Sequence, residues 1–146
     1  MKKMTKKLNN GSSANSLFEQ LNRILIIEDE EFLVPALRSD LEMEGCAIDV
    51  SGSGDEAIRH IRDNRPDLIL LDLLMTKQDG FYVVQKLKKN PDWMPIPVIV
   101  SSPLGSNSEI KRALEMGADD YYVKSPYVID EVIEKMKLYL EGTRTV

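Results

Sequence analysis

From residue 23 onward, short apolar runs alternate with segments in which apolar residues recur every three or four positions. Runs without polar alternation are typical of strands that are buried on both faces, as in parallel sheets. Five such runs are present, and most are rich in Val, Ile or Leu. They cover residues 23–27, 47–50, 67–71, 97–101 and 120–123.

The segments between these runs have the spacing of amphipathic helices. Pro35 is tolerable because it falls near the first turn of its helix, while Gly45 and Gly117 are placed where helices end. We interpret the apolar stripes as core packing rather than as functional groups. They run from Leu33 to Leu41, Ala57 to Ile61, Val83 to Leu87, Ile110 to Leu114 and Ile129 to Leu140.

Five strands that alternate with five helices predict βαβ units, a parallel sheet and right-handed crossovers. The length of 146 residues favours one domain with a core of its own. In sheets of this kind, ligands bind outside the carboxyl ends of the strands, at the switch point in strand order. The residues that directly follow the strands are therefore the place to look for chemistry.

Carboxylate, hydroxyl and ammonium groups stand at four of the five predicted strand ends. Carboxylates that gather in a partly desolvated cleft repel one another, so they call for a cation. Mg²⁺ suits this role, because it binds one or two carboxylates together with water and a phosphate group. The groups are Glu28, Asp29 and Glu30 after the first strand, Asp72 after the third, Ser101 and Ser102 at the fourth, and Lys124 after the fifth.

This set of groups can support transfer of a phosphoryl group to a carboxylate. Asp72 would be the nucleophile, and it needs no general base because it is already ionised at neutral pH. Mg²⁺ and Lys124 would neutralise the charge of the phosphoryl oxygens, and Ser102 would donate a hydrogen bond to one of them. Each residue alone has an ordinary interpretation, such as an acidic first turn or a surface lysine. Their joint occurrence at one edge of a sheet favours the site.

Composition and charge narrow the function further. The net charge is −5, and the sequence lacks the basic patch that would favour nucleic acid as a direct partner. Cys46 is the single cysteine, which rules out an intrachain disulfide and suits a reducing cytoplasm. We expect Cys46 to pack in the core and His60 to be a solvated helix residue.

The first residues are basic but lack the apolar run of a signal peptide, and no stretch approaches the length of a membrane span. We therefore expect a cytoplasmic protein without a membrane segment. Residues 1–20 are expected to be a disordered or partly helical extension, because Ser16-Leu17-Phe18-Glu19 matches a capping box. Residues 21–142 would form the domain.

With these motifs in view, the chain resembles the receiver domain of two-component response regulators, over roughly residues 22–141. No single motif is specific, but together they are. The matching stretches are ILIIEDE at 24–30, PDLILLDLLM at 66–75, Asp79-Gly80, IPVIVSS at 96–102 and GADDYYVK at 117–124. The resemblance implies a flavodoxin-like three-layer sandwich whose five-stranded parallel sheet has the order 2-1-3-4-5.

The resemblance also assigns a role to each residue of the site. Glu28 and Asp29 look like the acidic pair that binds Mg²⁺, and the backbone carbonyl of Leu74 would be a further ligand. Asp72 looks like the phosphoacceptor, Ser102 like the switch hydroxyl and Lys124 like the lysine that contacts the phosphoryl group. Tyr121 takes the place of the aromatic residue that changes rotamer with the switch.

Three positions depart from the family pattern. Ser125 follows Lys124 where the family usually has a proline with a cis bond, and a cis Lys-Ser bond would cost more than a cis X-Pro bond. Pro103 replaces the usual small residue after the switch hydroxyl. Thr76 stands where proline is common, which we expect to matter little. The conformation of the Lys124–Ser125 bond stays open at this point.

We expect a stand-alone receiver without an output domain, because few residues follow the fifth helix. Its partners would be a sensor histidine kinase or phosphotransfer protein, and a downstream protein target that binds the face formed by the fourth helix, fifth strand and fifth helix. One alternative is a degenerate receiver that binds a partner without phosphorylation. A phosphohydrolase of the haloacid-dehalogenase type is disfavoured, because Leu74 stands where such enzymes carry a second aspartate. Ser51-Gly52-Ser53-Gly54 is no complete nucleotide-binding fingerprint.

Overall fold

The computed structural model describes residues 22–28, 34–73, 75, 77–103, 107–123 and 129–145, with only the backbone of residues 77–79, 129 and 142–145. Five strands form one parallel sheet in the order β2-β1-β3-β4-β5, which confirms the predicted strand order. The strands are β1 (Arg23–Ile27), β2 (Ala47–Ser51), β3 (Leu68–Asp72), β4 (Val98–Ser102) and β5 (Asp120–Val123).

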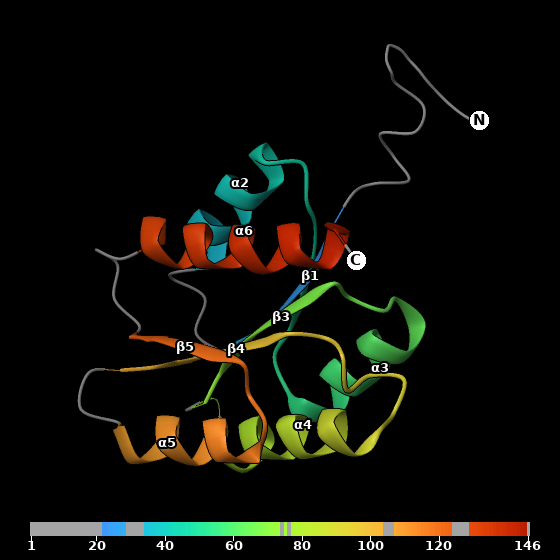
Figure 1. Cartoon of the computed structure of the whole chain (residues 1–146), viewed down its shortest axis with the longest axis vertical. Coiled ribbons are helices and arrows are strands. Elements are labelled where there is room, and N and C mark those ends of the chain that lie inside the picture. The colour runs from blue at the N-terminus through green and yellow to red at the C-terminus, as the bar shows by residue number, and fades with distance from the viewer. Residues whose placement is uncertain are drawn as a thin grey trace.

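Helices cover both faces of this sheet, so the described chain has three layers (Figure 1). Helices α2 and α6 lie on one face, and α3, α4 and α5 lie on the other. The predicted flavodoxin-like sandwich is therefore confirmed. The helices are α2 (Val34–Met43), α3 (Gly54–Asp63), α4 (Lys77–Lys89), α5 (Asn107–Met116) and α6 (Ile129–Thr145).

Two apolar clusters, one on each face, divide the strand residues by strict alternation. Along β3, Leu68 and Leu70 pack with α2 and α6, whereas Ile69 and Leu71 pack with α3, α4 and α5. Because successive side chains of a strand point to opposite faces, this alternation fixes the face of every residue in β3 and its neighbours. The same rule places the polar residues at the strand ends.

Local sequence signals account for several helix ends. Ser53 caps α3, and its side chain accepts a hydrogen bond of 3.2 Å from the amide of Glu56. Gly45 follows α2 with a φ of 90°, and Gly117 follows α5 with a φ of 119°, a region that favours glycine. Pro35 is the second residue of α2, where the lack of an amide proton is harmless.

The third and fourth strands each extend one residue further than their apolar patterns predict. Asp72 pairs with Ser101, and Ser102 pairs with Val123, so these polar residues close the ladder instead of following it. The backbone continues in register beyond Asp72, because the amide of Leu73 donates a 3.0 Å hydrogen bond to the carbonyl of Ser101. Because of this extension, the sheet fixes the backbone of Asp72 and Ser102 and therefore the face to which each side chain points. The expected N-terminal extension and its capping box lie outside the described residues.

Candidate phosphoacceptor site

Three polar residues form a row across the carboxyl ends of β1, β3 and β4. Ile27 pairs with Leu71, so Glu28 follows β1 at the level of Asp72, and Asp72 itself pairs with Ser101. Strand alternation points the three side chains to the face covered by α2 and α6. Neighbouring strands in a sheet are about 4.8 Å apart, so Glu28 and Asp72 are close neighbours.

All three side chains are buried, although two of them are acids. Glu28 is 4% exposed, Asp72 is 1% exposed, and Ser101 is also buried. The Ser101 hydroxyl lies 3.4 Å from the carbonyl of Leu71, and the backbone amide of Glu28 donates a 2.9 Å hydrogen bond to the carbonyl of Ser51. Two buried carboxylates on adjacent strands fit the ligand set of a hard divalent cation such as Mg²⁺.

The hydroxyl of Ser102 lies on the opposite face of the sheet from Asp72. It is fully buried, and its oxygen has no hydrogen-bond partner among the described residues. A buried hydroxyl without a partner is unfavourable, so it marks a place where a further polar group fits. Pro103, one of the departures from the family pattern, follows it directly and is half-buried.

Tyr121 shares the face of Ser102, because it pairs with Val100, two residues before Ser102 on β4. Its side chain is 42% exposed. A groove of about 440 Å³ lies between α5 and Tyr121, with Ile110 and Leu114 in its lining. The aromatic ring therefore lies on the surface formed by α5 and β5, with room around it.

Several predicted site residues lie outside the described part of the chain: Asp29, the backbone carbonyl of Leu74, and Lys124. The same holds for Thr76 and for the Lys124–Ser125 bond. Among the described residues, no group of three acidic, histidine or cysteine side chains surrounds a common point. Asp29, the third acidic residue of the predicted site, is not among the described residues.

Gly80 shows why the Asp-Gly motif matters at this site. It lies near the start of α4, and a Cβ atom there would come within 3.2 Å of both the Cα and the carbonyl oxygen of Leu73 and within 3.4 Å of the Asp72 carbonyl. These neighbours are backbone atoms that cannot turn aside. Glycine therefore lets α4 pack directly against the backbone of Asp72 and Leu73.

One contact that the sequence did not indicate supports the row of acids from the side of β2. The buried hydroxyl of Ser51 is hydrogen-bonded to Nδ1 of His60, and the carbonyl of Ser51 accepts the amide proton of Glu28. His60 is half-buried rather than simply solvated as we expected. The way α3 packs back beside β2 brings these residues together, and no local motif could have revealed it.

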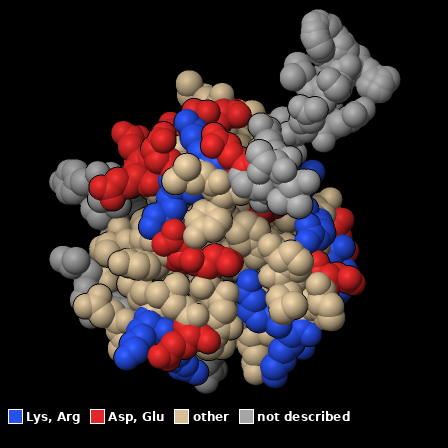
Figure 2. Space-filling view, viewed as in Figure 1, with Lys and Arg blue, Asp and Glu red and all other residues tan. Residues whose placement is uncertain are grey.

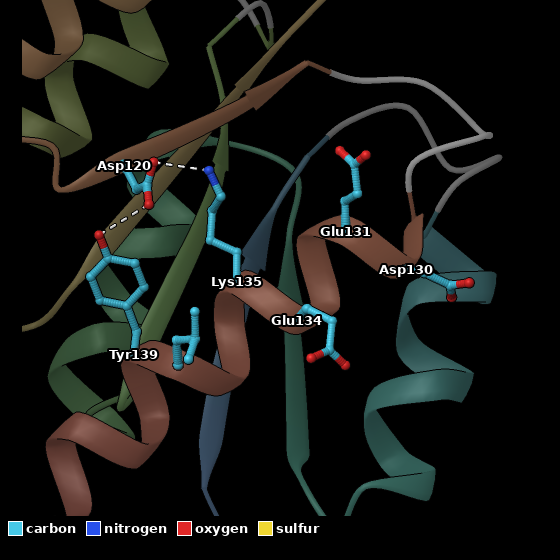
Figure 3. A pocket seen from close by; sticks show the side chains of 7 residues that line it. Asp120, Asp130, Glu131, Glu134, Lys135 and Tyr139 are labelled. Atoms are coloured by element: carbon cyan, nitrogen blue, oxygen red, sulfur yellow. Dashed lines mark hydrogen bonds and ion pairs between the residues drawn. The ribbon is translucent and has the colours of Figure 1, made fainter.

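A second polar network, at the β5 edge of the sheet, joins β5 to α6 (Figure 3). Asp120 accepts hydrogen bonds from Lys135 Nζ at 3.0 Å, from the Tyr121 amide at 2.8 Å and from the Tyr139 hydroxyl at 3.1 Å. Burial opposes the charged form of Asp120, but these donors together lower its pKa below the usual 3.8. For Tyr139, burial and the charges of Asp120 and Asp119 raise the pKa to about 12.

The described part of the chain contains no helix long and apolar enough to cross a membrane. Cys46 packs partly against the cluster under α2 and α6, as expected for a core cysteine.

Comparison with known sequences gives a consistent result. Residues 24–137 match the family described as response regulator receiver domain. The chain is 37% identical over 124 residues to the phosphate regulon transcriptional regulatory protein PhoB of Rhizobium meliloti (strain 1021), which covers 85% of this chain and 54% of that protein. It is 34% identical over 121 residues to response regulator MprA of Mycobacterium sp. (strain KMS), covering 83% and 51%. The chain thus spans about half the length of these curated relatives.

Solved structures of similar sequence share the fold. The receiver domain of the Francisella response regulator 1452 has a TM-score of 0.73 at 30% identity, covering 84% of this chain and 98% of that chain. The signal receiver domain of a signal transduction histidine kinase from Syntrophus aciditrophicus has a TM-score of 0.74 at 36% identity, covering 83% and 91%.

Proposed function

Because this chain belongs to the response regulator receiver domain family of two-component signalling, we propose that it accepts a phosphoryl group on Asp72 in a Mg²⁺-dependent reaction. The observation that carries this proposal is the row of buried acids, in which Asp72 closes β3 beside Glu28. A buried aspartate at the carboxyl end of a central strand is held by the sheet in a fixed position. Such a position suits a nucleophile that must be oriented rather than activated.

Glu28, Asp29, Asp72 and the backbone carbonyl of Leu74 are the groups that would hold Mg²⁺. When bound, the ion neutralises charge on the phosphoryl oxygens. The donor set of hard oxygen atoms fits Mg²⁺, and the close neighbours Glu28 and Asp72 gain most from it because both are buried.

In the proposed reaction, an oxygen of Asp72 forms a bond to phosphorus. The bond between phosphorus and the donor group breaks, and its electron pair leaves with the donor. Lys124 would balance the charge of the phosphoryl oxygens. The hydroxyl of Ser102 would move from the opposite face of the sheet toward the phosphoryl group and donate a hydrogen bond to one of its oxygens, which would give this buried hydroxyl a partner.

Binding of the phosphoryl group by Ser102 would also alter the surface near Tyr121. Both side chains lie on the α5 face of the sheet, two positions apart along neighbouring strands. A shift of Ser102 therefore opens or fills space next to the tyrosine ring, which shifts the balance between its exposed and buried positions. The face formed by α5, β5 and α6 would then present a different surface to a downstream protein. A sensor histidine kinase or a phosphotransfer protein would supply the phosphoryl group.

The test is intact-mass spectrometry after incubation with acetyl phosphate and Mg²⁺. The wild-type protein should gain the mass of one phosphoryl group, and chelation of Mg²⁺ should abolish the gain. Asp72→Asn should gain none, whereas Asp63→Asn, an exposed aspartate at the end of α3, should behave as the wild type.

A phosphoryl adduct that persists in Asp72→Asn would assign the acceptor to another residue. If the wild-type protein accepts no phosphoryl group from acetyl phosphate or from a phosphorylated phosphotransfer domain, the result would favour a receiver that binds its partner without phosphorylation. Pro103 and Ser125 are the sequence departures that would then explain the loss.

A further inference from the structure

An open groove of about 710 Å³ lies between β5 and the outer surface of α6 (Figure 3). Part of its lining is apolar, and we call this part the floor: Leu138, the ring of Tyr139 and the aliphatic stem of Lys135. Leu138 is 69% exposed. A single exposed leucine is ordinary, but one that forms the floor of a groove offers a contact for an apolar side chain of a partner.

Acidic side chains surround this floor. Four carboxylates line the groove, those of Asp120, Asp130, Glu131 and Glu134, together with one ammonium group, that of Lys135. That ammonium group is already bound to Asp120 and to the carbonyl of Tyr121, at 3.0 Å and 2.8 Å. It is therefore not available to neutralise the other three carboxylates.

The remaining carboxylates are poorly compensated. Glu134 lies 3.6 Å from Lys137 but is 74% exposed, which makes this pair weak. Within the described parts of the chain, no basic side chain lies within ion-pair distance of Asp130 or Glu131. The groove therefore carries a negative potential, and a positively charged ligand would relieve the repulsion.

The acidic surface continues from this groove toward α2. A neighbouring groove of about 420 Å³, between α2 and α6, shares Asp130 and Glu134 and adds Asp40, Glu44 and one basic residue, Lys137, which pairs with Glu44 at 3.3 Å. Met43 in its lining is 83% exposed. Figure 2 shows the acidic side chains gathered on this part of the molecule, over α2 and α6. Exposed apolar side chains with acidic neighbours thus recur across the surface.

We propose that the β5–α6 groove binds a segment of a partner protein that carries lysine or arginine residues and inserts an aliphatic side chain beside Leu138. The sign of the charge disfavours nucleic acids and anionic membranes, which would be repelled. The apolar floor disfavours a simple cation, which would gain nothing from Leu138. The inference deepens the proposed function, because it gives the chemistry of the target that the β5–α6 part of the signalling face recognises.

The experiment titrates the unphosphorylated full chain with a synthetic helical peptide of lysine and leucine residues, followed by fluorescence anisotropy. The peptide should bind, and high salt should weaken the binding because charges are screened. The triple variant Asp130→Asn, Glu131→Gln, Glu134→Gln should bind about tenfold more weakly. Leu138→Ser should lower the affinity several-fold at unchanged net charge.

The matched control is Asp63→Asn, Asp92→Asn, Glu115→Gln, which removes the same charge from exposed positions elsewhere. It should change the affinity by no more than about twofold, since screened charges at a distance contribute little. A second control peptide, with serine in place of leucine, should bind weakly.

Equal weakening by the control variant would mean that only the net charge is sensed, and the inference would be wrong. It would also be wrong if the lysine–leucine peptide did not bind, if the serine peptide bound equally well, or if Mg²⁺ alone displaced the peptide. The titration uses protein without a phosphoryl group, so it is independent of Asp72. A failed titration with a normal phosphoryl adduct would overturn only this inference, and the reverse result would overturn only the proposed function.

Discussion

Lys135 on α6 and Asp120 on β5 form an ion pair of 3.0 Å that ties the last helix to the edge strand (Figure 3). The same ammonium group donates a 2.8 Å hydrogen bond to the carbonyl of Tyr121 and lies 5.4 Å from the centre of its ring. One lysine thus contacts the edge strand through a carboxylate, the backbone and an aromatic face.

We expect Lys135→Met to raise the pKa of Asp120, because the charge and the hydrogen bond of Lys135 help to lower it. A depressed carboxylate pKa stabilises the fold above the pKa of the unfolded chain, and this stability is lost as the pH falls through the folded pKa. The variant should therefore lose less stability below pH 3.8 than the wild type. NMR titration of the Asp120 carboxyl group measures the shift, with Lys137→Met as the control on the same helix. An unchanged Asp120 titration would contradict the ion pair.

Tyr139→Phe removes the hydroxyl that lies 3.1 Å from Oδ2 of Asp120 and 3.2 Å from the carbonyl of Asp119. The free energy of unfolding should fall by about 1 kcal/mol, the usual net value of a hydrogen bond. The wild-type pKa of about 12 lies above the ordinary tyrosine value of 10.0, so the folded state holds this proton more tightly. Its contribution is present below pH 10 and is lost as the pH rises toward 12.

Denaturant unfolding at neutral and alkaline pH checks both effects of Tyr139. The difference in stability between wild type and Tyr139→Phe should shrink at the alkaline end. A phenolate absorbance titration should also lose its late-titrating component in the variant. If the late component remains, the raised pKa belongs to another tyrosine.

Gly80→Ala should destabilise the protein by about 1–3 kcal/mol, the usual range for overpacking. The added Cβ would lie 3.2 Å from backbone atoms of Leu73, so α4 or the chain after Asp72 must move. Phosphorylation by acetyl phosphate should slow as well, since Asp72 directly precedes Leu73 in the chain. Gly52→Ala is the matched control, because a Cβ there meets no atom within 4 Å. Equal stability of the two variants would show that the close approach at Gly80 is unimportant.

Two adjacent serines should respond differently to removal of the hydroxyl. Ser102→Ala deletes an oxygen without a hydrogen-bond partner among the described residues, so the free energy of unfolding should stay constant or rise by up to about 1 kcal/mol. Ser101→Ala deletes a hydroxyl that bonds to the carbonyl of Leu71, so stability should stay constant or fall.

Phosphorylation separates the two serines further. Under the proposed function, Ser102→Ala weakens the structural response to the phosphoryl group, and Ser101→Ala changes it little. Tyrosine fluorescence with and without acetyl phosphate measures this response. A normal response in Ser102→Ala would remove Ser102 from the proposed switch.

Much of the fold could be predicted from the sequence because its signals are local. The five apolar runs predict strands buried on both faces. This is confirmed for β1, β3 and β4, whereas the edge strands β2 and β5 are only partly buried. The helical spacing between the runs predicts the crossovers, and Gly45 and Gly117 end helices where their φ angles require glycine. The strand order 2-1-3-4-5 came from resemblance to a known family, since no local pattern orders strands in a sheet.

The candidate site was predicted only in part. The positions of Glu28, Asp72 and Ser102 at strand ends follow from the sequence, because a parallel sheet brings its carboxyl ends to one edge. The face of the sheet to which each side chain points depends on the residue at which its strand ends. β3 and β4 each run one residue longer than their apolar patterns, which makes Asp72 and Ser102 part of the alternation.

The sequence by itself determined the alternation of strands and helices, the acidic and hydroxyl groups at the strand ends, and the glycines that end two of the helices. Tertiary structure alone decided that Ser51 meets His60, that Lys135 reaches Asp120, and that β5 and α6 form a groove beside Leu138. The reason is distance along the chain. Periodicity and turn chemistry act between residues that are close in the sequence. These contacts instead join a strand to a helix, and they depend on how the helices pack on the sheet.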